Sequence, residues 1–265
     1  MSLQFIMGNS GSGKSYCLYD TVVREAIENP DKNYLVIVPE QFTMQTQKDL
    51  CLAHPKGGIM NIDVLSFGRL AYRVFEEVGQ DARVVLDDEG KNLVLRKIAG
   101  ECEKDLKVFK GNLKKQGYIS EVKSVLSEFA QYGVDFERLD DFMKEVPPES
   151  YLHYKLDDIR TIYEKFEEYL SEKYITKEEM LDVLSDAVPY SDILKGSVVA
   201  MDGFTGFTPV QNRLIGELFS VCEKVMITVT MDGRENPYVY EHPYQIFALG
   251  KQMVTSLMKI AGEKK

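Results

Sequence analysis

The chain has 265 residues, of which 44% are hydrophobic and 28% are charged, a composition typical of globular proteins that bury a core. Its net charge of −10 argues against an autonomous nucleic-acid-binding protein, because such proteins usually carry a basic surplus. The sequence has no apolar run of about 20 residues, no secretory signal and no paired cysteines, so we expect a cytoplasmic protein without membrane contact or structural metal.

Strand-like and helix-like segments alternate in the first part of the chain. An apolar run, "LQFIM" at 3–7, predicts a buried strand that leads into a glycine-rich loop and then a helix. Further strands are predicted at 34–39 and 59–65, and each is followed by a helix, at 40–53 and 66–78. This alternation is typical of βαβ units in a parallel sheet.

The middle of the chain reads differently. From about 87 to 192 no strand-like run is visible, and apolar residues recur at helical spacing, most regularly over 152–170. The sequence "VPPES" at 146–150 separates two helical blocks, because prolines end helices and serve at the start of the next one. We therefore predict that this region is entirely helical. Its acidic part, with 17 Asp and Glu against 7 Lys and Arg over 135–192, is interpreted as a solvated face.

Strand rhythm returns in the last part of the chain. Strands are predicted at 197–204 and 224–230, and helices at 208–219 and 244–262. Thr208 is a candidate N-cap for the first of these helices, since Pro209 follows it in the first turn.

These patterns together predict an α/β fold. We expect a five-stranded parallel sheet with helices on both faces, and an all-helical domain inserted between the third and fourth strands. The sheet domain is predicted to comprise residues 1–84 and 197–265, and the insertion residues 85–196.

The glycine-rich loop after the first strand fits G-x-x-x-x-G-K-[ST] without a mismatch. In such a P-loop the glycines let backbone N–H groups converge on phosphate oxygens, at the positive end of the following helix. The lysine charge reaches the β- and γ-phosphates, and the serine hydroxyl reaches Mg²⁺. A glycine-rich turn that merely caps a helix is the alternative. The predicted ATP-binding residues are Gly8, Asn9, Ser10, Gly11, Ser12, Gly13, Lys14 and Ser15.

A second acidic position is needed to hold the metal of a P-loop ATPase. Asp202 in "VVAMDGF" follows an apolar strand, so Mg²⁺ is predicted to bind at Ser15 and Asp202, although a simple turn would also explain an Asp-Gly pair. Gly203 follows in place of the glutamate that polarises water in active enzymes, and the next carboxylate is Glu217. No catalytic residue is therefore assigned, and ATP hydrolysis is left open.

Four segments in this order carry a resemblance: the P-loop, "VPEQFTMQTQKDL", "VLSFGRLAYRVFEEVG" and "MDGFTGFTPVQNRLI". Over nearly its whole length the chain resembles the N-terminal part of the AddB family, whose members are the second subunits of bacterial AddAB helicase–nucleases. The resemblance implies a superfamily 1 helicase-like, RecA-like domain with a helical insertion. It also implies ATP and Mg²⁺ as cofactors, single-stranded DNA as a ligand, and AddA as heterodimer partner in double-strand break repair by homologous recombination.

The resemblance also implies where DNA is contacted. Residues 39–41 match a helicase-like motif Ia, and Ser66 with Phe67 matches a neighbouring DNA-facing segment. A lysine-rich stretch at 104–123, with 6 lysines against 2 acidic residues, adds further candidates. Core packing of Phe67 and a solvated helix face for the lysines are the alternatives. The predicted DNA contacts are Ser66, Phe67, Arg69, Lys114 and Lys115.

Two parts that the family implies are missing from this sequence: a second RecA-like domain, and a nuclease domain with an iron–sulfur cluster near the far C-terminus. We therefore expect a fragment of an ATP-dependent helicase/exonuclease that alone neither unwinds nor cuts DNA. Two other functions stay open. One is a small-molecule P-loop kinase with a helical lid. Such a lid usually needs several arginines for the second phosphate substrate, but the insertion has only three, and they are dispersed: Arg96, Arg138 and Arg160. The other is a scaffold with a vestigial nucleotide site.

Overall fold

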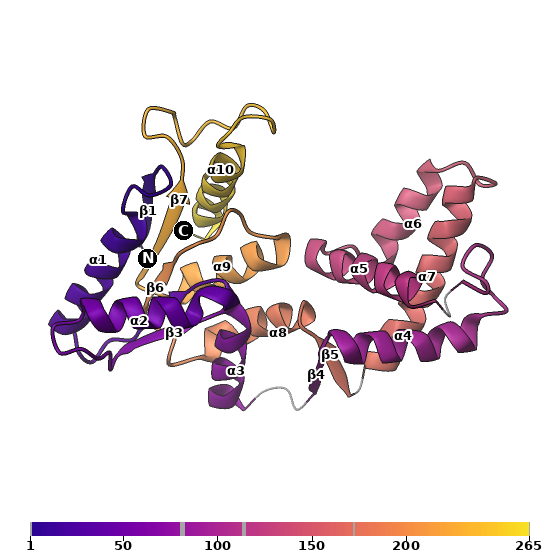
Figure 1. Ribbon diagram of the computed structural model, residues 1–265, viewed down its shortest axis with the longest axis horizontal. Helices are drawn as coiled ribbons and strands as arrows, with labels where there is room; N and C mark the ends of the chain where they lie inside the picture. Colours follow the sequence, from indigo (N-terminus) through magenta and orange to yellow (C-terminus); the bar gives the residue numbers. More distant parts are fainter. Residues whose placement is uncertain (1, 80–82, 113–114, 172, 265) are drawn as a thin grey trace. The chain divides into compact units, whose positions relative to one another are not determined.

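The computed structural model describes residues 2–79, 83–112, 115–171 and 173–264, and Figure 1 traces them. They divide into two compact units. The first comprises Met1–Gln80 with Leu181–Lys265, and the second comprises Asp81–Met180. Among the residues described, no helix is long and apolar enough to cross a membrane.

The first unit contains a five-stranded sheet in which every pairing is parallel. An α/β fold with a parallel five-stranded sheet is therefore confirmed. The inner strands are buried on both faces, as their continuous apolar runs require. The strand order across the sheet is β1 (Ser2–Gly8), β7 (Lys224–Thr230), β6 (Val198–Met201), β2 (Tyr34–Ile37) and β3 (Ile62–Leu65).

Helices and short 3-10 turns connect the strands of this sheet. The helices are α1 (Lys14–Glu28), α2 (Thr43–Ala53), α3 (Phe67–Val78), α8 (Glu179–Ala187), α9 (Pro209–Val221) and α10 (Ala248–Glu263), with 3-10 turns at Glu40–Phe42 and Val188–Tyr190. They cover the sheet, with α1 on one side and α9 and α10 on the other (Figure 1).

The helix starts follow the capping signals of the sequence. Thr208 is the cap of α9, as predicted, and forms a capping box with Gln211. Ser66, which was predicted as a DNA contact and not as a cap, caps α3, and this helix begins at Phe67, one residue later than predicted. The last helix, α10, begins at Ala248, four residues later than predicted.

The second unit is built mainly from four helices around their own apolar core. The helices are α4 (Asp88–Cys102), α5 (Gln116–Tyr132), α6 (Phe136–Glu145) and α7 (Tyr151–Leu170). Its most buried side chains include Leu95, Ile98, Ile119, Ile162 and Leu170, each no more than 2% exposed. Because this core is separate from that of the sheet, the second unit has its own source of stability.

A two-stranded parallel sheet in the second unit corrects the prediction that this region is entirely helical. β4 (Val84–Leu86) pairs with β5 (Tyr174–Thr176), with Val84 opposite Tyr174. Each strand has only three residues, which is too few for an alternation of apolar and polar residues to be recognised in the sequence. The two strands also lie 90 positions apart in the chain. Only the tertiary structure brings the two segments together.

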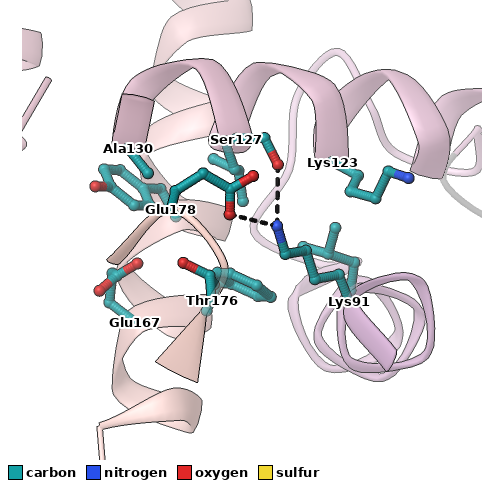
Figure 2. A pocket seen from close by; sticks show the side chains of 11 residues that line it. Lys91, Lys123, Ser127, Ala130, Glu167, Thr176 and Glu178 are labelled. Carbon is teal, nitrogen blue, oxygen red and sulfur yellow. Dashed lines mark hydrogen bonds and ion pairs between the residues drawn. The ribbon is translucent and has the colours of Figure 1, made fainter. Parts of the chain in front are cut away.

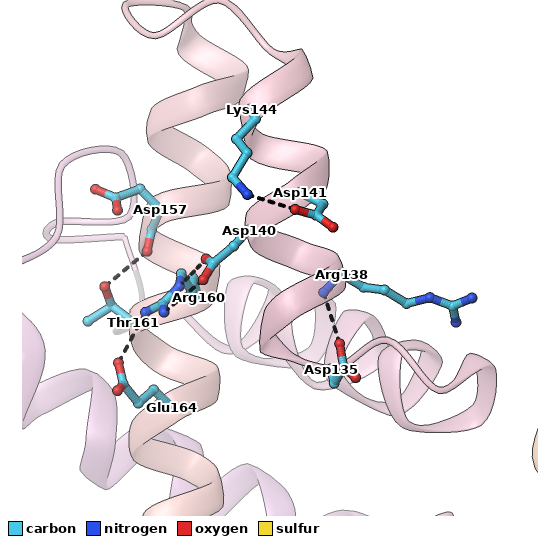
Figure 3. A network of polar contacts seen from close by, with 9 residues as sticks. All are labelled: Asp135, Arg138, Asp140, Asp141, Lys144, Asp157, Arg160, Thr161 and Glu164. Carbon is cyan, nitrogen blue, oxygen red and sulfur yellow. Dashed lines mark hydrogen bonds and ion pairs between the residues drawn. The ribbon is translucent and has the colours of Figure 1, made fainter.

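Charged side chains join α6 to α7 on the solvent side of the second unit, as Figure 3 shows. The Arg160 guanidinium donates to both oxygens of Asp140, at 2.5 and 3.2 Å, and it lowers the pKa of that carboxyl. A further nitrogen of Arg160 lies 3.3 Å from Glu164, and Arg138 donates to the carbonyl of Gly133 at 3.2 Å. Two of the three arginines that a kinase lid would use therefore serve internal contacts.

Candidate nucleotide-binding site

The loop between β1 and α1 depends on glycines at three positions. Gly11 and Gly13 adopt φ angles of 74° and 86°, a left-handed conformation that strains other residues. A Cβ on Gly8 would collide with the Ser12 hydroxyl, so the loop folds closely over the end of the strand. Gly13 also directly precedes α1, and the chain thus turns sharply into the helix.

This loop presents donors for an anion. The Lys14 ammonium donates to the Asn9 carbonyl at 2.9 Å, which holds the positive charge over the loop. Among the described residues, no backbone hydrogen bond occupies the N–H groups of Gly11, Gly13 or Ser15. Unpaired N–H groups at the positive end of a helix favour phosphate groups. The arrangement can therefore bind the phosphates of a nucleotide.

Asp202 lies at the same edge of the sheet. β6 ends at Met201, which pairs with Ile227 of β7, so Asp202 is level with Thr228. Thr228 in turn pairs with Ile6 of β1, two residues before the loop begins. Two strand spacings, or about 10 Å, therefore separate Asp202 from the backbone of β1.

The Asp202 carboxylate is 7% exposed and accepts two hydroxyl hydrogen bonds. Thr228 donates to Oδ1 at 2.5 Å, and Tyr19 donates to Oδ2 at 2.8 Å. The Tyr19 hydroxyl also lies 3.2 Å from the Thr46 hydroxyl, and burial raises the pKa of Tyr19 above its usual value. A carboxylate has about four lone-pair positions, so acceptor capacity is left over after these two bonds.

Three residues of this site were not predicted from the sequence: Tyr19, Thr46 and Thr228. The one available signal was the spacing of Tyr19, four residues after Ser15 and therefore on the same face of α1. Thr46 and Thr228 carry no local signal, because they lie 27 and 209 positions from Tyr19 in the chain.

The oxygen atoms at this edge suit Mg²⁺. Ser15 supplies an exposed hydroxyl and Asp202 a carboxylate, and Mg²⁺ takes one or two protein oxygens together with phosphates and water. Within the described part of the chain, no three His, Cys, Asp or Glu residues gather as a metal site of their own. Because Ser15 and Asp202 offer two protein oxygens, Mg²⁺ bound here would complete its octahedral coordination with phosphate and water oxygens.

Two of the predicted DNA contacts already have roles in the fold. The Ser66 hydroxyl caps α3 by accepting from the Arg69 backbone at 3.3 Å. Phe67 is 7% exposed, and its ring centroid lies 5.4 Å from that of Phe204 and 6.3 Å from that of Phe207. The buried ring corresponds to the core-packing alternative for Phe67.

The basic candidates divide between the two units. The exposed Arg69 side chain belongs to the first unit and pairs with Glu40 at 3.2 Å. Lys115 belongs to the second unit, where its ammonium contacts Asn112 at 3.2 Å and lies 6.0 Å from the centre of the Tyr118 ring. Lys114 lies outside the described residues. The DNA contacts all stay predictions.

A small pocket in the second unit contains a group of hydrogen-bonded polar side chains among apolar ones (Figure 2). Lys91 is 3% exposed, and its ammonium lies 2.6 Å from Glu178 and 3.2 Å from the Ser127 hydroxyl. Burial, with the neighbouring Glu179 as a second cause, raises the pKa of Glu167 to about 7. Lys91, Glu178 and Ser127 thus pair with one another, and together with Glu167 they form the polar centre of the helical unit.

Comparison with known proteins gives a consistent set of relatives. The sequence family described as "ADDB, N-terminal" matches residues 5–265. A Lachnoclostridium phytofermentans protein is 46% identical over 262 residues, which cover 98% of this chain and 23% of the relative. Proteins from Thermoanaerobacter sp. and Alkaliphilus oremlandii are 38% and 32% identical, cover 99% and 98% of this chain, and are themselves covered to 22%. All three are named as the second (B) component of an ATP-dependent helicase/deoxyribonuclease, and this chain spans less than a quarter of their length.

Proposed function

The chain belongs to the family of AddB N-terminal regions, and on that premise we propose that it is the ATP-binding, helicase-like part of a helicase/nuclease subunit in DNA repair. The observation that carries the proposal is the loop at 8–15, with its left-handed glycines, unpaired N–H groups and positioned lysine. In this proposal the first unit is a RecA-like P-loop domain, and the second unit is an insertion into it.

Four residues of the loop have distinct parts in binding. The N–H groups of Gly11, Gly13 and Ser15 bind phosphate oxygens, and the Lys14 ammonium exchanges the Asn9 carbonyl for the β- and γ-phosphates. Ser15 and Asp202 would hold Mg²⁺, which neutralises charge on the phosphates when it is bound. The N–H groups and the Lys14 ammonium that bind the phosphates are thus already held in place by the loop.

The segment after Asp202 supports weak or absent hydrolysis. Gly203 has a φ of 80°, and a Cβ there would lie 3.4 Å from Pro39. A glutamate at this position would be strained by the left-handed backbone, although the space around its Cβ would be ordinary, and the glycine leaves this position without a carboxylate to polarise an attacking water. We therefore propose that the chain binds nucleotide without acting as a motor by itself. In the whole protein it would contact single-stranded DNA, with Arg69 and Lys115 as exposed candidates, and act with AddA as its partner.

Calorimetric titration of the chain with Mg·ATP tests the proposal. Binding is expected for the wild type and for Lys56→Ala, an exposed control, and is expected to be lost in Lys14→Ala. Phosphate release measured with and without single-stranded DNA should be negligible. Equal binding by Lys14→Ala would refute the nucleotide site, and rapid DNA-stimulated release would refute the absence of a motor.

A further inference from the structure

Four side chains from four elements form one hydrogen-bonded chain in the first unit. It runs from Thr46 of α2 through Tyr19 of α1 and Asp202 after β6 to Thr228 of β7. Thr46 and Thr228 are each 4% exposed, and Asp202 is 7% exposed. Polar groups with this degree of burial require partners, and here the four side chains supply them to one another.

The two hydroxyl groups restrict the carboxylate of Asp202. One donor lies on each oxygen, at 2.5 Å from Thr228 and 2.8 Å from Tyr19, and together they oppose rotation about the Cβ–Cγ bond. Hydrogen bonds to a charged acceptor are the strong ones, and outer partners of this kind orient metal-binding carboxylates. The Thr46 hydroxyl holds the Tyr19 hydroxyl in place from the far side.

Tyr19 also connects Asp202 to the loop. It stands one helical turn after Ser15 on α1, so the helix that presents the Ser15 hydroxyl also sets the position of Asp202. Both oxygen groups proposed to face Mg²⁺ therefore depend on α1, directly for Ser15 and through the Tyr19 hydroxyl for Asp202.

We propose that Tyr19 is a positioning residue that holds the Asp202 carboxylate in the orientation needed for the metal of a bound nucleotide, with Thr228 as the second support and Thr46 as the anchor of Tyr19. The inference rests on the proposed function, since it concerns Mg²⁺ bound together with ATP. Tyr19 itself does not touch the metal or the nucleotide.

The test compares Tyr19→Phe with Tyr16→Phe, which removes a hydroxyl from a 77% exposed tyrosine of the same helix. Mg²⁺ is titrated calorimetrically into the chain saturated with a non-hydrolysable ATP analogue, and the affinity for the analogue is also measured in EDTA. Tyr19→Phe is expected to lower the Mg²⁺ affinity about tenfold without changing the affinity in EDTA. Tyr16→Phe is expected to change neither value.

Three further variants keep the inference testable if Tyr19→Phe does not fold. Thr228→Val should reproduce the loss of Mg²⁺ affinity, and Thr228→Ser, which keeps the hydroxyl, should restore it. Thr46→Val leaves both bonds to Asp202 in place and should lower the Mg²⁺ affinity less than Tyr19→Phe does.

Unchanged Mg²⁺ affinity in both Tyr19→Phe and Thr228→Val would overturn the inference while leaving nucleotide binding intact. An equal loss of analogue affinity with and without Mg²⁺ would also overturn it, because a merely structural role has that effect. If the wild type binds no nucleotide under either condition, the proposed function and this inference fall together.

Discussion

Replacing Asp158 by asparagine should destabilise the second unit, because this carboxylate organises the segment after α4. Asp158 is 1% exposed on α7 and accepts three consecutive backbone N–H groups, those of Lys107, Val108 and Phe109, at 2.8, 2.7 and 2.8 Å. Oδ2 accepts two of these bonds and Oδ1 accepts one. An asparagine has the same shape but replaces one acceptor oxygen by a donor.

The magnitude follows from these contacts. At least one backbone N–H would face the new NH₂ group, and the bonds that remain would lose the negative charge of the acceptor. Hydrogen bonds to charged groups contribute about 1.5–3 kcal/mol each, and a buried donor without a partner costs about 1–3 kcal/mol. We expect Asp158→Asn to lower the free energy of unfolding by about 2–4 kcal/mol.

Urea denaturation followed by circular dichroism measures this change, and hydrogen exchange at 107–109 locates it. Asp157→Asn is the matched control, because Asp157 is the preceding residue and its carboxylate makes an exposed ion pair with Lys107, at 3.0 Å. That control should change the free energy of unfolding by less than about 1 kcal/mol. A loss in Asp158→Asn no larger than in Asp157→Asn, with unchanged exchange at 107–109, would refute the reasoning.

Two further predictions concern the polar centre of the second unit. Because the pKa of Glu167 is raised to about 7 in the folded state, the folded chain binds more protons than the unfolded chain between about pH 4.5 and 7, and stability falls as pH rises through that range. Glu167→Gln should remove this fall, as thermal unfolding at several pH values would reveal; an unaltered pH profile would contradict the assignment. Lys91→Met leaves the Glu178 carboxylate, which is only 13% exposed, without its lysine partner and should cost about 3 kcal/mol in urea unfolding. The double variant Lys91→Met/Glu178→Gln should recover most of that loss, and equal stability of the single and double variants would argue against the ion pair as the cause.

The signals that could be read from the sequence are local ones. The loop at 8–15 satisfies its motif within eight residues, and Ser66 and Thr208 cap their helices through bonds to residues three positions ahead. The buried strands show as continuous apolar runs bounded by turns, and this pattern was sufficient to predict the five parallel strands. The two caps close within one turn of the chain, so their partners are near in the sequence. The apolar run of a buried strand is also a local pattern, although the strand it pairs with lies far along the chain.

The features that the sequence did not reveal depend on distant partners. β4 and β5 are too short for a periodic signal and exist because they pair with each other. Phe67 could be either a DNA contact or a core residue until Phe204 and Phe207 were seen to pack against it. The hydrogen-bond partners of Lys91 lie 36 and 87 positions away in the chain, so the burial of its side chain could not be predicted from the sequence either.

The sequence by itself determined which groups lie at the edge of the sheet: a glycine-rich loop, a lysine, a serine and an aspartate after an apolar strand. The tertiary structure decided how these groups are held. The strand order places β7 between β1 and β6, which brings Thr228 beside Asp202, and α1 carries Tyr19 to the same carboxylate from 183 positions away. The physical reason is that a buried carboxylate requires hydrogen-bond donors. The packing of the helices against the sheet determines which hydroxyl groups supply those hydrogen bonds.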